Sequence, residues 1–190
     1  MTRENTKKLT LSAMFFALGI VLPFLIGQIP AIGKMLSPMH IPVLFCGLIV
    51  GWKYGLIVGF LLPLVRSVLF GMPALFPNAT GMAFELGTYG FVIALVYSRF
   101  PHKNTMAVYI SLITAMLAGR IVWGIAQVIM LGVTGGAFTF QAFITIAFVN
   151  SIPAIILQLI LIPVVMASLD KAGIVCFREY EKISVNKILL

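Results

Sequence analysis

Two ionisable side chains stand inside long apolar stretches of this sequence. Glu85 lies in the segment MAFELGTYG, between the uncharged runs 75–84 and 86–97, and Arg120 is the only charged residue in 105–131. If these runs cross a membrane, each side chain costs roughly 2.5–3.5 kcal/mol to insert, so it normally faces a partner or a ligand. A carboxylate accepts hydrogen bonds and a guanidinium donates them. The two groups can therefore pair with each other, or they can hold a polar ligand together.

Other polar and aromatic residues fall on the same helical faces. Helical spacing places Asn78, Met82 and Tyr89 on the face of Glu85, and Trp123, Gly124 and Gln127 on the face of Arg120. His40 and Asn150 fall in the same half of other apolar runs. This mixture is typical of a pocket for a small, polar, ring-containing ligand. The binding residues that we predict are Glu85, Tyr89, Arg120, Trp123, Gln127, Asn150, Asn78 and His40.

Simpler roles are open for the same residues. Glu85 and Arg120 can form an ion pair that only locks two helices together. Tyr89 and Trp123 have the residue types of ordinary core or interface aromatics, and His40 suits an interfacial position as well as a pocket.

The composition indicates which medium, lipid or water, surrounds the chain. The chain has 190 residues, of which 61% are hydrophobic and 9% charged, and its mean hydropathy is +1.12. Soluble domains carry roughly a quarter charged residues, so we expect lipid rather than water around this chain. The long apolar runs lack the alternation of a membrane barrel, and helices are the remaining way to pair every backbone group in lipid.

The apolar runs predict six membrane-spanning helices. We expect an all-α integral membrane bundle that forms a single domain over residues 1–190, with Ser37 and Pro38 at the start of the second helix as cap and first helical residue. Pro63, Pro153 and Pro163 are expected to kink their helices. The predicted spans are residues 9–26, 37–50, 54–70, 79–98, 105–131 and 142–169.

The basic residues predict the orientation. With the N-terminus inside, ten of the 13 Lys and Arg residues lie on the inner side, Lys34 lies outside, and Arg66 and Arg120 lie within spans. The positive-inside rule then places both termini in the cytoplasm. The net charge of +8 is explained by this inner face, and we expect no nucleic-acid partner.

The outer loops carry almost no charge. Residues 27–36, 70–78 and 132–141 are rich in apolar, Gly and Pro residues. Such loops suit a lid over a cavity, or they can dip into the lipid headgroups.

The sequence carries no motif for chemistry. The patterns G-x-x-x-x-G-K-[ST], G-x-S-x-G and H-E-x-x-H are absent, and Cys46 and Cys176 have no metal-ligand or redox spacing. We therefore expect no catalytic residue, no metal and no cofactor in this chain. Two alternatives stay open: an intramembrane enzyme with His40 and Glu85 as an acid–base pair, and a stand-alone secondary carrier with Glu85 as its proton site. No inverted repeat is evident, which argues mildly against the carrier.

Small residues recur at four-residue spacing. The stretch LSAMFFALG holds Ala13 and Ala17, and Gly47, Gly51, Gly55 and Gly59 continue the rhythm in the second and third predicted spans. Two small residues four apart let another helix approach closely. For the glycines we expect tight packing inside the bundle, and Ala13 and Ala17 lie where a partner could dock at the inner face.

The whole chain resembles the substrate-binding S components of energy-coupling factor (ECF) vitamin transporters. The resemblance is carried by LSAMFFALG, by LSPMHIPVLFCGLIVGWKYGLIVGFLLPLVRSVLFGMP and by MAFELGTYGFVIALVY. It implies that Ala13 and Ala17 dock on a membrane T subunit, which sits on two cytoplasmic ATPases that use the ATP. It also implies a vitamin pocket in the outer half, capped by the first outer loop, in a multi-pass protein of a bacterial cell membrane.

The resemblance leaves several ligands open. Pantothenate is anionic and suits Arg120 or Arg66, whereas a pyridoxine-like or hydroxymethylpyrimidine-like ring suits Glu85 as acceptor with Trp123 or Tyr89 for stacking. We rank these two kinds level, with riboflavin slightly behind because it needs a larger cavity.

Overall fold

The structure is a computed structural model that describes residues 3–26, 37–101, 103–133, 139, 141 and 144–172. The described residues form helices and contain no strand. Two π-helical turns, η1 (Leu75–Ala79) and η2 (Thr145–Val149), precede the fourth and the sixth long helix. The longer helices are α1 (Arg3–Ile26), α3 (His40–Val50), α4 (Trp52–Phe70), α5 (Thr80–Arg99), α6 (Thr105–Val133) and α8 (Ile152–Lys171).

The six predicted helices are confirmed, and five of them are long and apolar enough to cross a membrane. The predicted starts of the first and the last helix need correction. The first helix begins at Arg3 rather than at residue 9, because its polar first turns stay helical and Lys8 pairs with Glu4 at 2.8 Å. The last begins at Ile152 rather than at residue 142, because a turn at 150–151 separates it from η2.

The predicted cap of the second helix is wrong. Ser37 has a φ of 43°, in the left-handed region, and its side chain does not cap the helix. Met39 occupies the N-cap position, and the helix begins at His40, whose backbone N–H donates to the Ser37 carbonyl at 3.1 Å. Helix α3 therefore has only 11 residues.

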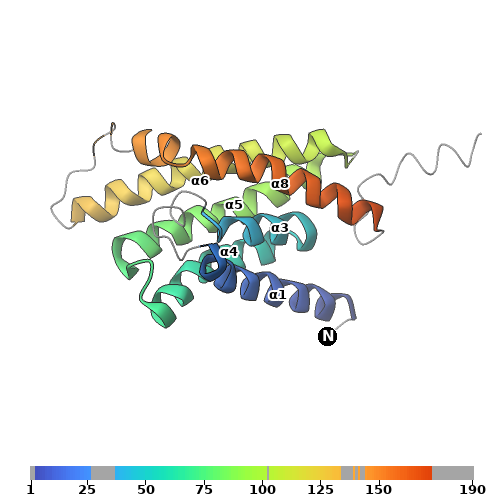
Figure 1. Cartoon of the computed structure of the whole chain (residues 1–190), viewed down its shortest axis with the longest axis horizontal. Helices are drawn as coiled ribbons and strands as arrows, with labels where there is room; N and C mark the ends of the chain where they lie inside the picture. Colours follow the sequence, from blue (N-terminus) through green and yellow to red (C-terminus); the bar gives the residue numbers. More distant parts are fainter. Residues whose placement is uncertain are drawn as a thin grey trace, which may run out of the picture.

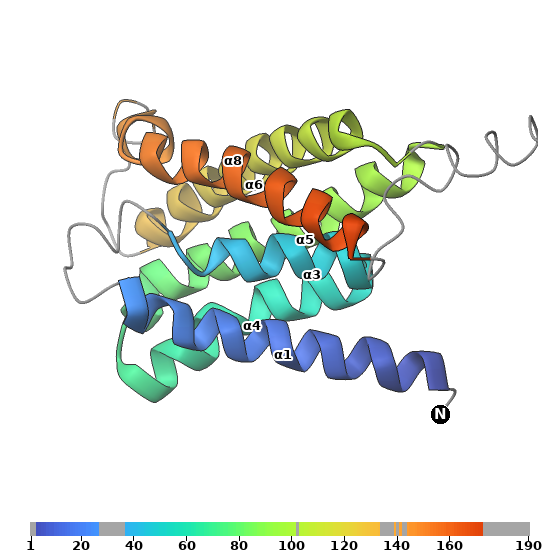
Figure 2. The same ribbon diagram turned by 45° about the vertical axis from the view of Figure 1, so that its right-hand side comes forward.

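Helix α3 lies at the centre of the bundle. All its residues are buried except Ile49, which is half-buried. It contacts α1, α4, α5 and α8, while α4 packs on α5 and α5 on α6. Figures 1 and 2 show α1 and α8 on opposite sides of this central helix.

Three helices approach closely where glycines meet. A Cβ at Gly47 or at Gly55 would lie 2.6 Å from the Gly90 carbonyl oxygen, so α3, α4 and α5 are in backbone contact there. A Cβ at Gly59 would likewise overlap the backbone of Leu86. The expected tight packing is confirmed at these positions. Gly51 differs, because it has open space around it and forms the junction between α3 and α4 with a φ of 114°.

The described cations of the helix ends gather at one end of the bundle. In Figure 1 the start of α1, the connection between α5 and α6 and the end of α8 lie at the same end. We call this the basic end, and it holds the residues that the positive-inside rule predicts to lie on the inner side. Its described cations are Arg3, Lys7, Lys8, Lys53, Arg99, Lys103 and Lys171. The predicted lid at 27–36, Lys34, Cys176 and most of the loop 132–141 lie outside the described residues.

Candidate functional site

Glu85 is the centre of a buried polar cluster. Its side chain is 3% exposed, and its Oε1 lies 2.9 Å from Nη1 of Arg120. The hydroxyl of Tyr89 donates to the same oxygen at 3.0 Å, and Nε2 of His40 lies 3.7 Å from it. We call these four residues the Glu85 cluster. It joins three helices, because His40 comes from α3, Glu85 and Tyr89 from α5, and Arg120 from α6.

Helical spacing and one glycine position these side chains. Glu85 and Tyr89 are four residues apart, so they lie on one face of α5 and their side chains meet. Gly119 precedes Arg120 on α6, and a Cβ at this position would overlap the ring of Tyr89. The bare backbone of Gly119 therefore lets the ring of Tyr89 lie against α6 while its hydroxyl reaches Glu85.

The short length of α3 brings His40 to the cluster. Eleven residues rise about 16 Å, roughly half of a 30 Å hydrocarbon core. The last residue of α3, Val50, lies at the basic end. The first residue, His40, therefore lies near mid-depth in the bundle. The positive end of its dipole thus faces the interior, and an anion such as Glu85 is favoured there.

Hydrogen bonding fixes the direction of the His40 ring. Its Nδ1 lies 3.1 Å from the carbonyl oxygen of Ser37, and a carbonyl only accepts, so Nδ1 carries a proton. Its Nε2 is buried, faces Glu85 and has no hydrogen-bond partner among the described residues. The ring centroid lies 5.3 Å from that of Tyr89, at an interplanar angle of 56°.

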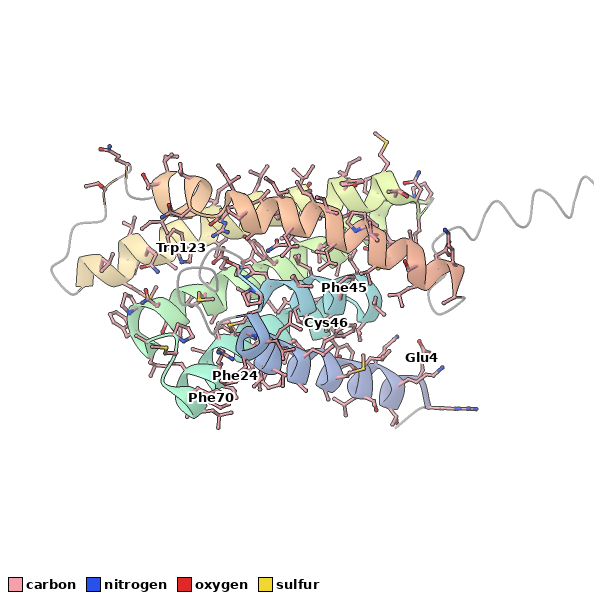
Figure 3. All side chains as sticks on the ribbon, viewed as in Figure 1. Glu4, Phe24, Phe45, Cys46, Phe70 and Trp123 are labelled. Carbon is pink, nitrogen blue, oxygen red and sulfur yellow. The ribbon has the colours of Figure 1, made fainter. Side chains whose placement is uncertain are left out.

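Trp123 and Gln127 extend the cluster away from the basic end. Both are buried on α6, where Figure 3 labels Trp123. A Cβ at Gly81 would lie 2.7 Å from Nε2 of Gln127 and 3.4 Å from Nε1 of Trp123. Both polar ends therefore lie beside the backbone of α5, one turn before Glu85. An indole and a carboxamide stand next to the ionised groups, as the helical-face argument predicts.

The structure does not bring Asn78 and Asn150 into the buried cluster. Both side chains are exposed, Asn78 in η1 and Asn150 in the turn before α8. The face argument assumed one continuous α-helix through 78–89, but Asn78 belongs to the π-helical turn η1 and α5 begins only at Thr80. Binding by these two residues stays a prediction.

Two further polar residues matter that were not among the predicted binding residues. Gln158 on α8 is 2% exposed, and its Oε1 has no partner among the described residues. Arg66 on α4 donates from Nη1 to the Ile20 carbonyl at 2.6 Å, and its guanidinium lies 4.6 Å from the ring centroid of Phe24 and 5.7 Å from that of Phe70. Figure 3 shows these two rings beside each other. Arg66 thus joins α4 to α1 and takes no part in the Glu85 cluster.

Ala13 and Ala17 are on the outward side of the bundle. Both side chains are exposed on α1, together with the apolar side chains of Met14 and Leu18. This side of α1 presents small residues where a second helix can approach. Docking of a partner on it stays a prediction.

The described residues hold no group of three or more His, Cys, Asp or Glu side chains that could bind a metal ion. The chemistry that the cluster offers is hydrogen bonding, ion pairing and aromatic contact.

Apolar helices with exposed apolar side chains and polar groups turned inward define a multi-pass membrane protein with a buried polar site. A family model described as the ECF transporter substrate-specific component matches residues 7–166, and the chain belongs to this family. It is therefore a substrate-binding component of an ECF transporter, and family members work with a small-molecule substrate and an energising module. No curated protein and no solved structure matches the chain.

Proposed function

We propose that this protein captures a water-soluble B vitamin or vitamin precursor from outside the cell, and that the Glu85 cluster with Trp123 and Gln127 is its binding site. The observation that carries the proposal is the burial of Glu85, Arg120 and His40 on three different helices. Ionisable groups in membrane spans usually serve ligands or ions. The candidate ligands are pyridoxine or a hydroxymethylpyrimidine-like ring, pantothenate and riboflavin.

Transport itself requires partners. This chain has no nucleotide-binding motif, so ATP is used by two cytoplasmic ATPases that act through a membrane T subunit. Ala13 and Ala17 are exposed near the middle of α1, which supports docking of the T subunit on this side of the helix. We place the complex in the cell membrane of a bacterium, with the loop 27–36 as the lid over the ligand.

Ligand titration of the purified protein tests the binding proposal. One vitamin of the panel is expected to bind, and Glu85→Gln is expected to weaken that binding at least tenfold because the amide cannot keep the charged contacts of the carboxylate. Thr88→Ala is the matched control on α5, since Thr88 only bonds the Phe84 carbonyl of its own helix at 2.7 Å. Unchanged affinity in Glu85→Gln would remove the cluster from the binding site.

Uptake measurements test the role of the partners. Ala17→Leu is expected to keep ligand affinity but to reduce uptake and co-purification with the T subunit, because the longer side chain holds the partner helix away. Ala17→Ser keeps a small side chain at the same position and serves as the control with unchanged uptake. Full uptake by this chain without T subunit and ATPases would instead support a stand-alone carrier.

A further inference from the structure

We infer that the ligand of the Glu85 cluster is an uncharged heteroaromatic ring with hydroxyl or amino donors, and that one donor binds between His40 Nε2 and Glu85. The inference rests on the proposed function and chooses among its candidate ligands. Pyridoxine, hydroxymethylpyrimidine and riboflavin belong to this class, whereas the carboxylate of pantothenate does not.

The cations that could bind a carboxylate are already engaged. Arg120 pairs with Glu85 at 2.9 Å. Arg66 donates to the Ile20 carbonyl and lies over Phe24, so it is held between α1 and α4. In the described part of the chain these are the two cationic side chains inside the spans, away from the basic end. A carboxylate ligand would bring a second anion next to Glu85, and the described residues offer no further cation inside the spans to match it, which is costly in a buried site.

Two of the buried groups without a partner among the described residues, His40 Nε2 and Gln158 Oε1, need donors instead. With Glu85 ionised and Arg120 protonated, the cluster is neutral only if His40 is neutral. Because Nδ1 of His40 donates to the Ser37 carbonyl, the neutral ring presents a lone pair at Nε2. Nε2 lies 3.7 Å from Oε1 of Glu85, so in the neutral ring two acceptors face each other. A hydroxyl or amino group placed beside both would satisfy them.

A second buried acceptor lies on a helix that contacts two helices of the cluster. Oε1 of Gln158 is buried without a partner among the described residues, on the helix that packs against α3 and α6. A buried acceptor of this kind is stabilised by a ligand donor. The rings of Tyr89 and Trp123 supply the apolar and aromatic contact that a flat heterocycle uses.

A ligand panel on the wild-type protein tests the inference without any variant. Pyridoxine, hydroxymethylpyrimidine, riboflavin and pantothenate are titrated into detergent-purified protein by calorimetry, together with O-methylated derivatives of whichever ring binds. One ring is expected to bind, and methylation of its critical hydroxyl is expected to weaken binding about 10- to 100-fold, because the buried acceptors are then unpaired. Pantothenate is expected to bind at least 100-fold more weakly than the ring.

Variants of His40 add a second readout. His40→Phe removes the acceptor and is expected to weaken ring binding about 10-fold or more, while His40→Gln keeps an acceptor and is expected to lose less. Arg66→Gln lies outside the cluster and is the control with unchanged affinity. If His40→Phe does not fold, the methylated ligands decide alone.

Each other outcome contradicts the inference in its own way. Tight pantothenate binding that depends on Arg120 would overturn the ligand class and leave the vitamin-binding function standing. Ring binding that is insensitive to both methylation and His40→Phe would overturn the role of His40. No binding of any vitamin would overturn the inference and the proposed function together.

Discussion

The ion pair between Glu85 and Arg120 gives the sharpest prediction about stability. Its atoms are 2.9 Å apart and its side chains are 3% and 10% exposed. At this separation Coulomb's law gives about 6 kcal/mol at an effective dielectric constant of about 20. Breaking a buried pair from one side typically costs about 3–5 kcal/mol, because the remaining charge is left without its partner. We expect this cost for Glu85→Gln and for Arg120→Met.

The double variant separates the interaction energy between Glu85 and Arg120 from the effects of each single substitution. Glu85→Gln combined with Arg120→Met removes both charges, so it is expected to cost less than the sum of the single variants by at least about 1.5 kcal/mol. The free energy of unfolding is measured in detergent by circular dichroism during denaturation. Tyr89 can still donate to the new amide oxygen, which keeps the local contact with α5. Costs that simply add, with no coupling, would refute the reasoning that the two residues neutralise each other in the folded protein.

Two further variants test the packing that holds the site. Gly90→Ala is expected to lower the free energy of unfolding by about 1–3 kcal/mol, because the new methyl group would overlap the Gly55 backbone. Its control, Gly132→Ala, has open space and is expected to be neutral or slightly stabilising, so equal losses in both would contradict the close approach of α4 and α5. Arg66→Gln is expected to lower the melting temperature through the lost contact with Ile20 and Phe24 while the vitamin Kd stays unchanged, and a weaker Kd would place Arg66 in the binding site.

The helical bundle was predictable because a chain in lipid must pair its backbone N–H and C=O groups internally. Apolar runs of sufficient length must become helices, so the number of helices followed from the sequence. The pairing of Glu85 with Arg120 was one of two open alternatives, and depth along the helices made it plausible. The faces of α5 and α6 correctly placed Tyr89 beside the pair, and they placed Trp123 and Gln127 among the buried residues of the same region.

Features that depend on tertiary packing were not predictable in the same way. Ser37 and Pro38 resemble a helix start, but the chain enters α3 through a left-handed residue and a turn. The predictions for Asn78 and Asn150 assumed regular α-helix at both positions. Hydropathy does not reveal the π-helical turn η1 or the turn at 150–151. The role of Gly119 beside Tyr89 could not be seen before the two helices were placed together. The short second apolar run was the available sign that His40 would lie deep in the bundle.

The central claim is that the Glu85 cluster binds the ligand and does more than lock helices together. The most direct measurement is the vitamin Kd of the folded double variant Glu85→Gln/Arg120→Met, compared with the wild-type protein by calorimetry in the same detergent. Our account predicts that binding falls by at least a hundredfold while the circular dichroism spectrum stays helical. A double variant that binds the vitamin with wild-type affinity would contradict the account and leave the buried pair a structural contact.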